Sequence, residues 1–194
     1  MDELERKKIK EILENDGVVA FVTDTVWGIG CLPNSEKAVQ KIYEIKHRDG
    51  NKPLILMSFD IYPLLKYVKP LPKKAHELIK KHFAGALTLV VPKSDLTPDY
   101  ITSGFDTVGI RVPDNEVFQE ICKCVEGGVL ATTSANISSC PPALTYEEAV
   151  EYIGVSVDYV VQDYGLKAQG TASTVVGVSE DSLNVYRQGD IIID

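Results

Sequence analysis

Residues 18–31 read Val-Val-Ala-Phe-Val-Thr-Asp-Thr-Val-Trp-Gly-Ile-Gly-Cys, and the organisation of the chain is best approached from this stretch. Its first five residues are apolar and rich in valine, which predicts a short buried strand over Val18–Val22. Hydroxyl side chains, an aspartate and two glycines follow at once, so we expect a loop over Thr23–Cys31. Small polar groups at the end of a buried strand make this loop the first candidate for a binding site.

Helical and extended patterns alternate on both sides of this stretch. Residues 3–15 predict a helix that turns Leu4, Ile9, Ile12 and Leu13 inward and stops at Gly17. Further helices are expected over residues 36–47, 61–68, 72–83 and 116–125, and after the capping box at 145–148. Further strands are expected over residues 54–57, 87–91, 108–112, 129–132, 159–161, 173–178 and 184–186. This irregular alternation favours one α/β domain over residues 1–194, built on a twisted mixed sheet covered by helices.

Composition excludes several classes of protein. The 194 residues are 44% hydrophobic and 25% charged, which are values of a globular chain rather than a disordered or fibrous one. No apolar run approaches the ~18–20 residues that span a bilayer, and the charged start lacks the apolar segment of a signal peptide. Four cysteines are too few for a disulfide scaffold of this length. We therefore expect a cytoplasmic protein with no membrane contact.

Charge is divided unevenly along the chain. The net charge of −8 combines +4 in residues 1–93 with −12 in residues 94–194. The basic residues of the second half are Arg111, Lys123, Lys167 and Arg187. This asymmetry suggests an anionic ligand at a basic face rather than general affinity for nucleic acid. A lone arginine among acids either neutralises a neighbour or faces a bound anion.

The common nucleotide motifs do not match. Gly28-x-Gly30 is followed by Pro33 where a dinucleotide fingerprint needs glycine or alanine. Gly165 and Gly170 have Walker spacing, but threonine and alanine follow instead of lysine and a hydroxyl residue. If this chain uses ATP, it does so through another architecture.

Five segments place small hydroxyl or amide groups beside cations, near the ends of predicted strands. They are Thr23–Gly28, Lys46–Leu54, Gly109–Pro113, Thr132–Asn136, and Ala172–Val175 together with Tyr186–Gly189. Binding a polyphosphate without a P-loop needs several cations, and hydroxyl or backbone N–H groups that fix its geometry. Two of these segments also have a plainer interpretation: Lys46 and Arg48 could cap a helix, and Ser134 and Asn136 could form a turn.

The order of these segments resembles the YrdC-like threonylcarbamoyl-AMP synthases of the TsaC type, over about residues 17–189. The family's Lys-x-Arg and Ser-x-Asn pairs appear as Lys46–Arg48 and Ser134–Asn136. Its Thr-Asp-Thr-Val-Tyr-Gly-Leu-Gly stretch appears as Thr23–Gly30, and its Pro-Gly-Pro-Leu-Thr stretch as Ala84–Thr88. The resemblance implies the YrdC-like fold, a twisted mixed sheet flanked by helices with a concave basic cavity.

The resemblance also implies a nucleotidyltransferase reaction. L-Threonine, bicarbonate or CO2, and ATP would condense to threonylcarbamoyl-AMP, an L-threonylcarbamoyladenylate, with release of pyrophosphate. A separate tRNA threonylcarbamoyl transferase would then use this product to modify an adenosine of tRNA. No carboxylate cluster in the sequence suggests metal ligands, so Mg2+ would arrive bound to the triphosphate.

Site residues follow from the family positions, one by one. The implied catalytic residues are Lys46, Arg48, Ser134 and Asn136. The implied ATP-binding residues are Arg48, Lys52, Thr107, Ser134 and Arg187. The implied threonine-binding residues are Thr25, Arg111, Thr132 and Ser173. We expect Lys46 and Arg48 near the surface, where they would neutralise the departing pyrophosphate, and Arg111 to bind the threonine carboxylate.

Three positions leave the function open. Trp27 replaces the family tyrosine, and Met57 stands where some members place a histidine, so both bear on the choice of amino acid. Asp24 either stabilises a turn or has a further role. The alternatives to the synthase are a paralogue that handles another carbamoyl adenylate, and a module that binds double-stranded RNA or tRNA, weakly and in a salt-sensitive way given the net charge of −8.

Overall fold

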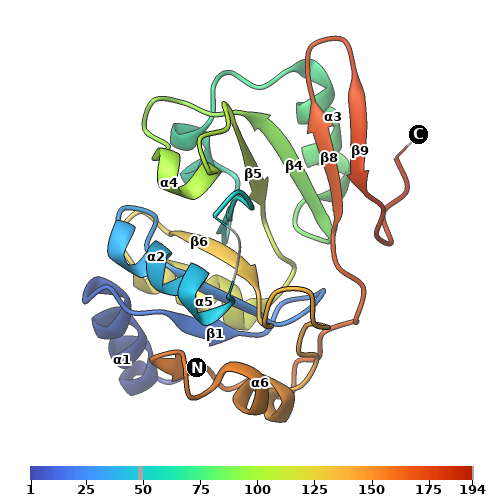
Figure 1. The fold of residues 1–194 in the computed structure, drawn as a ribbon. Coiled ribbons are helices and arrows are strands. Elements are labelled where there is room, and N and C mark those ends of the chain that lie inside the picture. Colours follow the sequence, from blue (N-terminus) through green and yellow to red (C-terminus); the bar gives the residue numbers. More distant parts are fainter. Residues whose placement is uncertain (48–49, 194) are drawn as a thin grey trace.

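The computed structural model describes residues 1–47 and 50–193, and its centre is one mixed sheet (Figure 1). The strands are β1 (Val19–Phe21), β2 (Gly28–Cys31), β3 (Ile55–Ser58), β4 (Leu87–Pro92), β5 (Thr107–Arg111), β6 (Val129–Ser134), β7 (Tyr159–Val160), β8 (Thr174–Val178) and β9 (Leu183–Arg187). The helices are α1 (Glu3–Glu14), α2 (Glu36–Ile45), a 3-10 helix η1 (Tyr62–Tyr67), α3 (Lys73–His82), α4 (Asp99–Thr102), α5 (Glu116–Cys124) and α6 (Tyr146–Ile153).

The order of the strands in the sheet is β7-β1-β2-β6-β3-β5-β4-β8-β9. Three neighbouring pairs are parallel, namely β1 with β7, β3 with β5, and β4 with β8. In Figure 1, β1 and β6 lie in the lower part of the molecule with α1, α2, α5 and α6, and β4, β8 and β9 lie in the upper part with α3. The expected twisted mixed sheet flanked by helices is confirmed.

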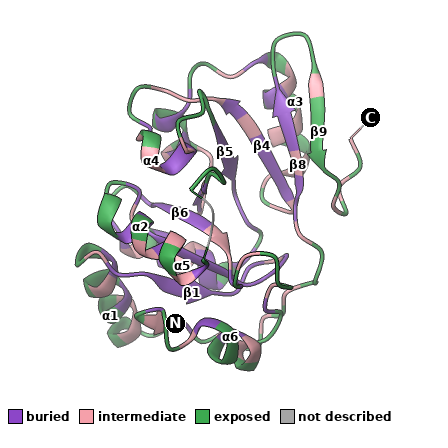
Figure 2. Cartoon of the chain, viewed as in Figure 1, coloured by how far each residue is buried: buried purple, intermediate pink, exposed green. Residues whose placement is uncertain are grey.

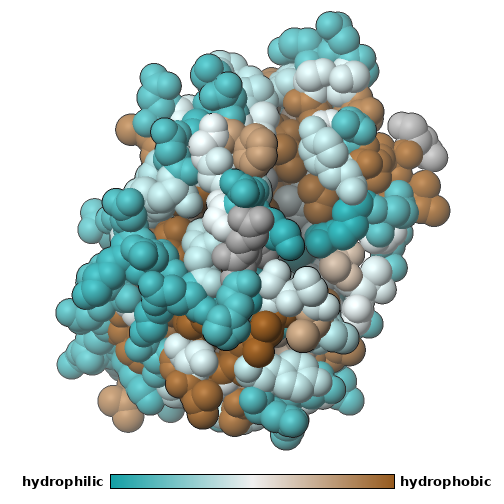
Figure 3. All heavy atoms as spheres, viewed as in Figure 1, coloured by the Kyte–Doolittle hydropathy of each residue, from teal (hydrophilic) through white to brown (hydrophobic). Residues whose placement is uncertain are grey.

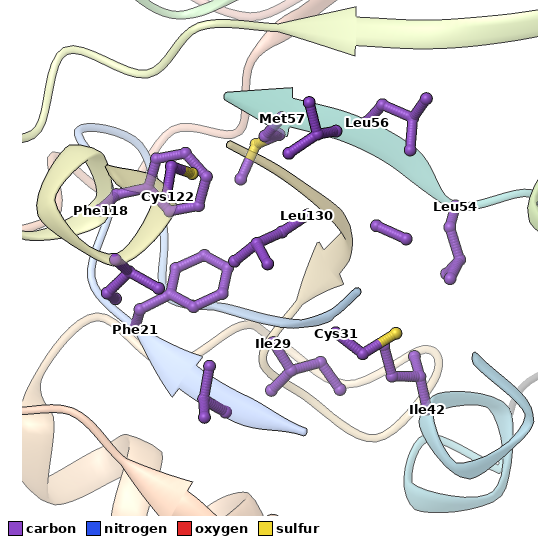
Figure 4. Packing of buried hydrophobic residues seen from close by; sticks show 14 of the residues in the cluster. Phe21, Ile29, Cys31, Ile42, Leu54, Leu56, Met57, Phe118, Cys122 and Leu130 are labelled. Carbon is purple, nitrogen blue, oxygen red and sulfur yellow. The ribbon is translucent and has the colours of Figure 1, made fainter. Parts of the chain in front are cut away.

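Part of the core lies between the lower half of the sheet and its helices. Phe21 of β1 packs against Phe118 of α5 with ring centroids 4.9 Å apart, and Leu130 points toward them (Figure 4). Ile42 of α2 lies beside Cys31 and Ile29 of β2 (Figure 4). Each such side chain contributes ~1.5–3 kcal/mol by leaving water. Figure 2 shows the consequence: the strands other than β9 are buried along most of their length, and the helices are exposed on their outer faces.

Helix α1 forms as expected but differs in two details. Its N-cap Asp2 accepts a hydrogen bond from the Glu5 amide at 2.8 Å, and Ile9 and Leu13 are buried. The expectation for Leu4 is wrong, since Leu4 lies in the first turn and is 78% exposed. The residue with positive φ after the helix is Asp16, at 59°, rather than Gly17.

The expectation of a loop is wrong for residues 28–31, which form β2. All four residues of β2 are buried, and β2 pairs with both β1 and β6. A Cβ on Gly28 would lie 2.9 Å from Cε2 of Phe21, so glycine is what lets the neighbouring side chain pack over this strand. Pairing with β1 and β6 and burial by distant parts of the chain outweigh the low preference of glycine for strands here.

Other element ends shift by small amounts. Helix α2 ends at Ile45 rather than at residue 47, and His47 already has a φ of 46°. The capping box before α6 is half formed: Thr145 accepts from the Glu148 amide at 3.2 Å, whereas the Glu148 carboxylate accepts from the Leu144 amide. Helix α4 has four residues and was not predicted. Within residues 1–47 and 50–193, no helix combines the length and the apolar character needed to cross a membrane.

Candidate active site

A cavity of about 210 Å³ lies against the sheet, lined by residues of both of its halves. Its lining includes Gly28 of β2, Thr132 of β6 and Ile55 of β3, and, from the other half, Thr88 of β4 and Val175 of β8. This volume is below the ~300–1,000 Å³ of pockets for drug-sized ligands, so it suits a group of amino-acid size. The charged residues that line it, within the described part of the chain, are Arg111 and Arg187.

Arg111, at the end of β5, is the most firmly held of these cations. The residue is 4% exposed, and its Nε donates to the Gly85 carbonyl at 3.0 Å. Nη1 donates to Oγ1 of Thr25 at 2.9 Å, and Nη2 forms an ion pair and hydrogen bond with the Asp24 carboxylate. A guanidinium has five N–H groups, so these bonds leave two without a partner among the described residues. Arg111 is thus fixed in place while it keeps donors for an acceptor in the cavity.

Burial governs the ionisation of this pair. It raises the pKa of Asp24, although the charge of Arg111 opposes the change. It also lowers the pKa of Arg111, with Asp24 opposing this change and the positive charge of Arg187 adding to it. Because arginine stays protonated in proteins, Arg111 remains a cation and Asp24 is its counter-ion. The question left open for Asp24 therefore has a structural answer: it contacts Arg111 directly.

The loop that carries Asp24 and Thr25 is itself tied down. Oγ1 of Thr23 donates to the Val26 carbonyl at 2.6 Å and accepts from the Thr25 amide at 3.2 Å. The carbonyl of Asp24 accepts from the amide of residue 169, and that of Thr25 from the amide of Gly170 at 2.8 Å. The segment between β7 and β8 therefore holds this loop from outside, and both partners of Arg111 have fixed backbones.

A second cation, Arg187, is held at the other side of the cavity. Its Nε donates to the Ser173 carbonyl at 2.9 Å and its Nη2 donates to Oγ of Ser173 at 3.1 Å. Ser173 is 3% exposed, and its hydroxyl lies 2.8 Å from Oγ1 of Thr88. Arg187 as a whole is exposed, but its guanidinium is partly covered where it contacts Ser173, and this partial burial lowers the pKa of Arg187. Arg187 can therefore reach a ligand at the rim of the cavity.

Lys46 meets the Ser-x-Asn pair, Ser134 and Asn136, at the carboxyl end of β6. The ammonium of Lys46 donates to the carbonyl of Ser134, and to the carbonyl and Oδ1 of Asn136 at 2.8 Å each. Oγ of Ser134 donates to Oδ1 of Asn136 at 2.6 Å. The expectation that Lys46 lies near the surface is wrong, because Lys46 is 1% exposed. Arg48 lies outside the described residues.

The structure brings together most of the predicted site. The predicted residues that line the cavity are Thr25, Arg111, Thr132, Ser134, Ser173 and Arg187. Lys52 and Thr107 are exposed and stand outside this lining set. No role was predicted for Thr88 or for the Gly85 carbonyl, and two roles were left open for Asp24. A hydroxyl residue on a buried strand was the available signal for Thr88, since such a group needs a partner.

Trp27 and Met57 form an apolar part of the wall. Both line the cavity, and the ring of Trp27 meets that of Tyr146 edge to face, with centroids 6.0 Å apart. Trp27 is fully buried, and its indole N–H has no hydrogen-bond partner among the described residues. These two side chains are placed where they can select the size of a bound side chain.

The described residues do not form a ready metal site. Residues 1–47 and 50–193 contain no group of three or more histidine, cysteine or acidic side chains suited to an ion. The cavity lining supplies hydroxyls and guanidiniums, whereas Mg2+ prefers carboxylate, phosphate and water oxygens.

Comparison with known proteins gives consistent matches. The Sua5/YciO/YrdC family model, described as "Telomere recombination", matches residues 11–189. Threonylcarbamoyl-AMP synthase of Halorhodospira halophila is 36% identical over 149 residues, which cover 77% of this chain and 78% of that protein. Threonylcarbamoyl-AMP synthase of Bacillus subtilis is 36% identical over 182 residues, which cover 93% of this chain and 52% of that protein.

A solved structure extends this similarity to three dimensions. P. abyssi Sua5, in a crystal structure complexed with L-threonine, matches 97% of this chain with a TM-score of 0.91 and 31% identity. The match covers 55% of that chain, so this chain spans about half the length of the P. abyssi and B. subtilis proteins. The family model nevertheless spans nearly all of the present sequence, and the relatives share its fold and a third of its residues. This chain belongs to the Sua5/YciO/YrdC family.

Proposed function

We propose that this chain is an L-threonylcarbamoyladenylate synthase, a nucleotidyltransferase that forms threonylcarbamoyl-AMP and pyrophosphate from L-threonine, bicarbonate or CO2, and ATP. The observation that carries the proposal is the anchored Arg111 in a cavity of amino-acid size. The names of the relatives and the threonine bound to P. abyssi Sua5 support the choice of substrate.

The threonine would bind at Arg111. Its carboxylate would accept from the two N–H groups of Arg111 that have no partner among the described residues. Thr25, Thr132 and Ser173 supply buried hydroxyls around the same space. Trp27 would face the apolar part of the amino acid. Hydroxyls and a guanidinium together suit a small zwitterion with a hydroxyl side chain.

The nucleotide would bind along the exposed side of the cavity. Ser134 and Arg187 line the cavity, and Lys52 and Thr107 are exposed near the ends of β3 and β5. Arg48 completes the proposed set from outside the described residues. A polyphosphate bound here would face several cations and hydroxyls, which compensate its charge without a P-loop.

In the reaction, the amino group of threonine and CO2 first give an N-carboxylate. An oxygen of that carboxylate attacks the α-phosphorus of ATP, the bond to the bridging oxygen breaks, and pyrophosphate leaves with the electron pair. This chemistry needs two anions held in line, so cations and positioning contribute more than a strong base does. Mg2+ bound to the triphosphate would supply further charge compensation, and the described cavity residues offer it no dedicated ligands.

The product would leave for a separate enzyme. We propose a cytoplasmic protein acting as one domain, whose adenylate is consumed by a tRNA threonylcarbamoyl transferase. Direct contact with tRNA is not needed for the first step. The net charge of −8 on this protein disfavours strong binding to an RNA backbone.

The test is pyrophosphate release by the purified chain with ATP, Mg2+ and bicarbonate. L-Threonine is compared with L-serine and with no amino acid, and the adenylate product is identified by mass. We expect release that depends on threonine and on bicarbonate. Release with another amino acid only would favour the paralogue, and no release with any amino acid would contradict the synthase.

A further inference from the structure

The side chain of Lys46 is the most unusual buried group outside the cavity lining. It belongs to the largest fully buried side chains, together with residues such as Trp27 and Phe21. A lysine is seldom fully buried unless its ammonium is satisfied by partners. Here the ammonium faces three oxygens, from Ser134 and Asn136, which match the three N–H groups that it can donate.

These bonds add to the backbone hydrogen bonds that hold the segment after β6, such as the one from the Ala135 amide to the Trp27 carbonyl. Strand β6 pairs with β2 as far as Ser134, and the chain then turns away from the sheet. Lys46 contacts this turn through its side chain and its backbone. The ammonium donates to residues 134 and 136, and the backbone carbonyl accepts from the Ser138 amide at 2.8 Å. Asn136 in turn holds the next part of the segment, since its Nδ2 donates to the Cys140 carbonyl at 2.5 Å.

The fastened segment is part of the cavity wall. Ser134 lines the cavity, whereas Lys46 and Asn136 are not among the described residues that do so. Ala135 lies between Ser134 and Asn136 in this turn, and its amide donates to the Trp27 carbonyl at 2.8 Å. The same turn therefore also supports the apolar wall of the cavity. A shift of this turn would therefore move both a hydroxyl and an aromatic side of the site.

We infer that Lys46 is a positioning residue, whose ammonium holds the Ser134–Asn136 turn in the shape that the cavity offers to its substrates, and that it does not bind the phosphates directly. The inference rests on the proposed function for its kinetic consequences. It replaces the expectation of a surface clamp on pyrophosphate for this one residue. A phosphate ligand would need N–H groups directed at the ligand, whereas those of Lys46 are directed at protein oxygens.

The experiment compares Lys46→Met with Lys37→Met. Lys37 lies on α2, the helix that Lys46 caps, and its side chain is exposed. The first measurement is the unfolding temperature without ligand. Lys46→Met leaves buried carbonyls without a donor, so we expect a fall on the order of 5–10 °C. For Lys37→Met we expect a change of less than about 2 °C.

The second measurement is made at 20 °C, where the variants are folded, and gives the Kd for ATP and the kcat for pyrophosphate release. We expect Lys46→Met to lower kcat at least tenfold, and to make the further effect of Ser134→Ala much smaller than in the wild type, because the two changes act on one unit. If Lys46→Met does not fold, Lys46→Gln, which keeps two N–H donors, takes its place.

Two outcomes would overturn the inference. An unchanged or raised unfolding temperature combined with lost ATP affinity would make Lys46 a phosphate ligand. A lowered unfolding temperature with wild-type Kd and kcat would leave it a purely structural residue. Failure of the proposed function is seen separately, as a wild type without turnover. In that case the unfolding temperatures and the Kd for ATP of Lys46→Met and Ser134→Ala still decide whether Lys46 binds the phosphates of ATP or holds the cavity wall in place.

Discussion

Replacing Arg111 by methionine tests the centre of the site most directly. The substitution keeps a long side chain but removes the partner of Asp24, whose side chain is 10% exposed. Removing one member of a buried ion pair costs ~3–5 kcal/mol, because the other charge is left unpaired. We therefore expect the free energy of unfolding to fall by about 3–5 kcal/mol. Urea denaturation at pH 7 measures it, and adding Asp24→Asn to Arg111→Met is expected to restore part of the loss.

The same variant tests the proposed threonine subsite. A hydrogen bond from a charged donor contributes ~1.5–3 kcal/mol, so loss of the Arg111 contact is expected to raise the KM for threonine about 10- to 150-fold. Pyrophosphate release at varied threonine and saturating ATP measures this change, with Arg111→Lys as the variant that keeps the charge and loses the fork. A change confined to the KM for ATP would show that the two subsites are reversed. Wild-type stability would refute the account of the buried pair.

Three further changes have definite expected outcomes. Trp27→Tyr makes the apolar wall smaller, so the ratio of kcat/KM for threonine over serine is expected to fall by up to about tenfold; an unchanged ratio would place the substrate methyl group elsewhere. The hydrogen bond from Arg6 lowers the pKa of Glu120 below its usual 4.5, so the stability from this pair is present above about pH 4.5 and lost as the pH falls through the lowered value. Both side chains are more than one third exposed, so Glu120→Gln is expected to cost below about 1 kcal/mol at pH 7 and less than that at pH 3, by urea denaturation. Gly109→Ala would place a Cβ 2.6 Å from Cγ2 of Ile55, so the Ile55 side chain or its strand must shift, at a cost of about 1–3 kcal/mol measured in the same way.

Local patterns were sufficient for the elements with strong periodicity. The helix near Glu116 and the strand ending at Arg111 form within a residue or two of their expected bounds, because capping and apolar spacing act locally. Strand β2 was missed, since its glycines favour a strand only once β1 and β6 lie on either side of it. The order of the strands depends on such pairings and could not be read from the sequence.

The site shows the same division. The resemblance to the family identified residues such as Thr25 and Ser173 that line one cavity, because the family's motifs can be matched in the sequence residue by residue. The contacts between them were not visible. The bond from Arg111 to Asp24 joins residues 87 positions apart, and that from Lys46 to Asn136 joins residues 90 apart. Whether a cation faces a ligand or a protein oxygen is decided by these distant contacts, which is why Lys46 was placed at the surface.

Charge along the chain proved to be a poor guide to charge in space. The lysines of the basic first half lie largely on exposed helices, and Figure 3 shows hydrophilic side chains over the face that carries α2. The two cations that line the cavity, Arg111 and Arg187, come instead from the acidic second half. A lone arginine among acids was expected either to neutralise a neighbour or to face a bound anion, and Arg111 can do both. Three of its N–H groups donate to protein oxygens, one of them on Asp24, and two have no partner among the described residues. Neutralising Asp24 fixes the guanidinium in advance, so a carboxylate that binds there loses little free energy to ordering the side chain. That pre-ordering is the physical reason to assign the amino acid, rather than the polyphosphate, to the buried end of the cavity.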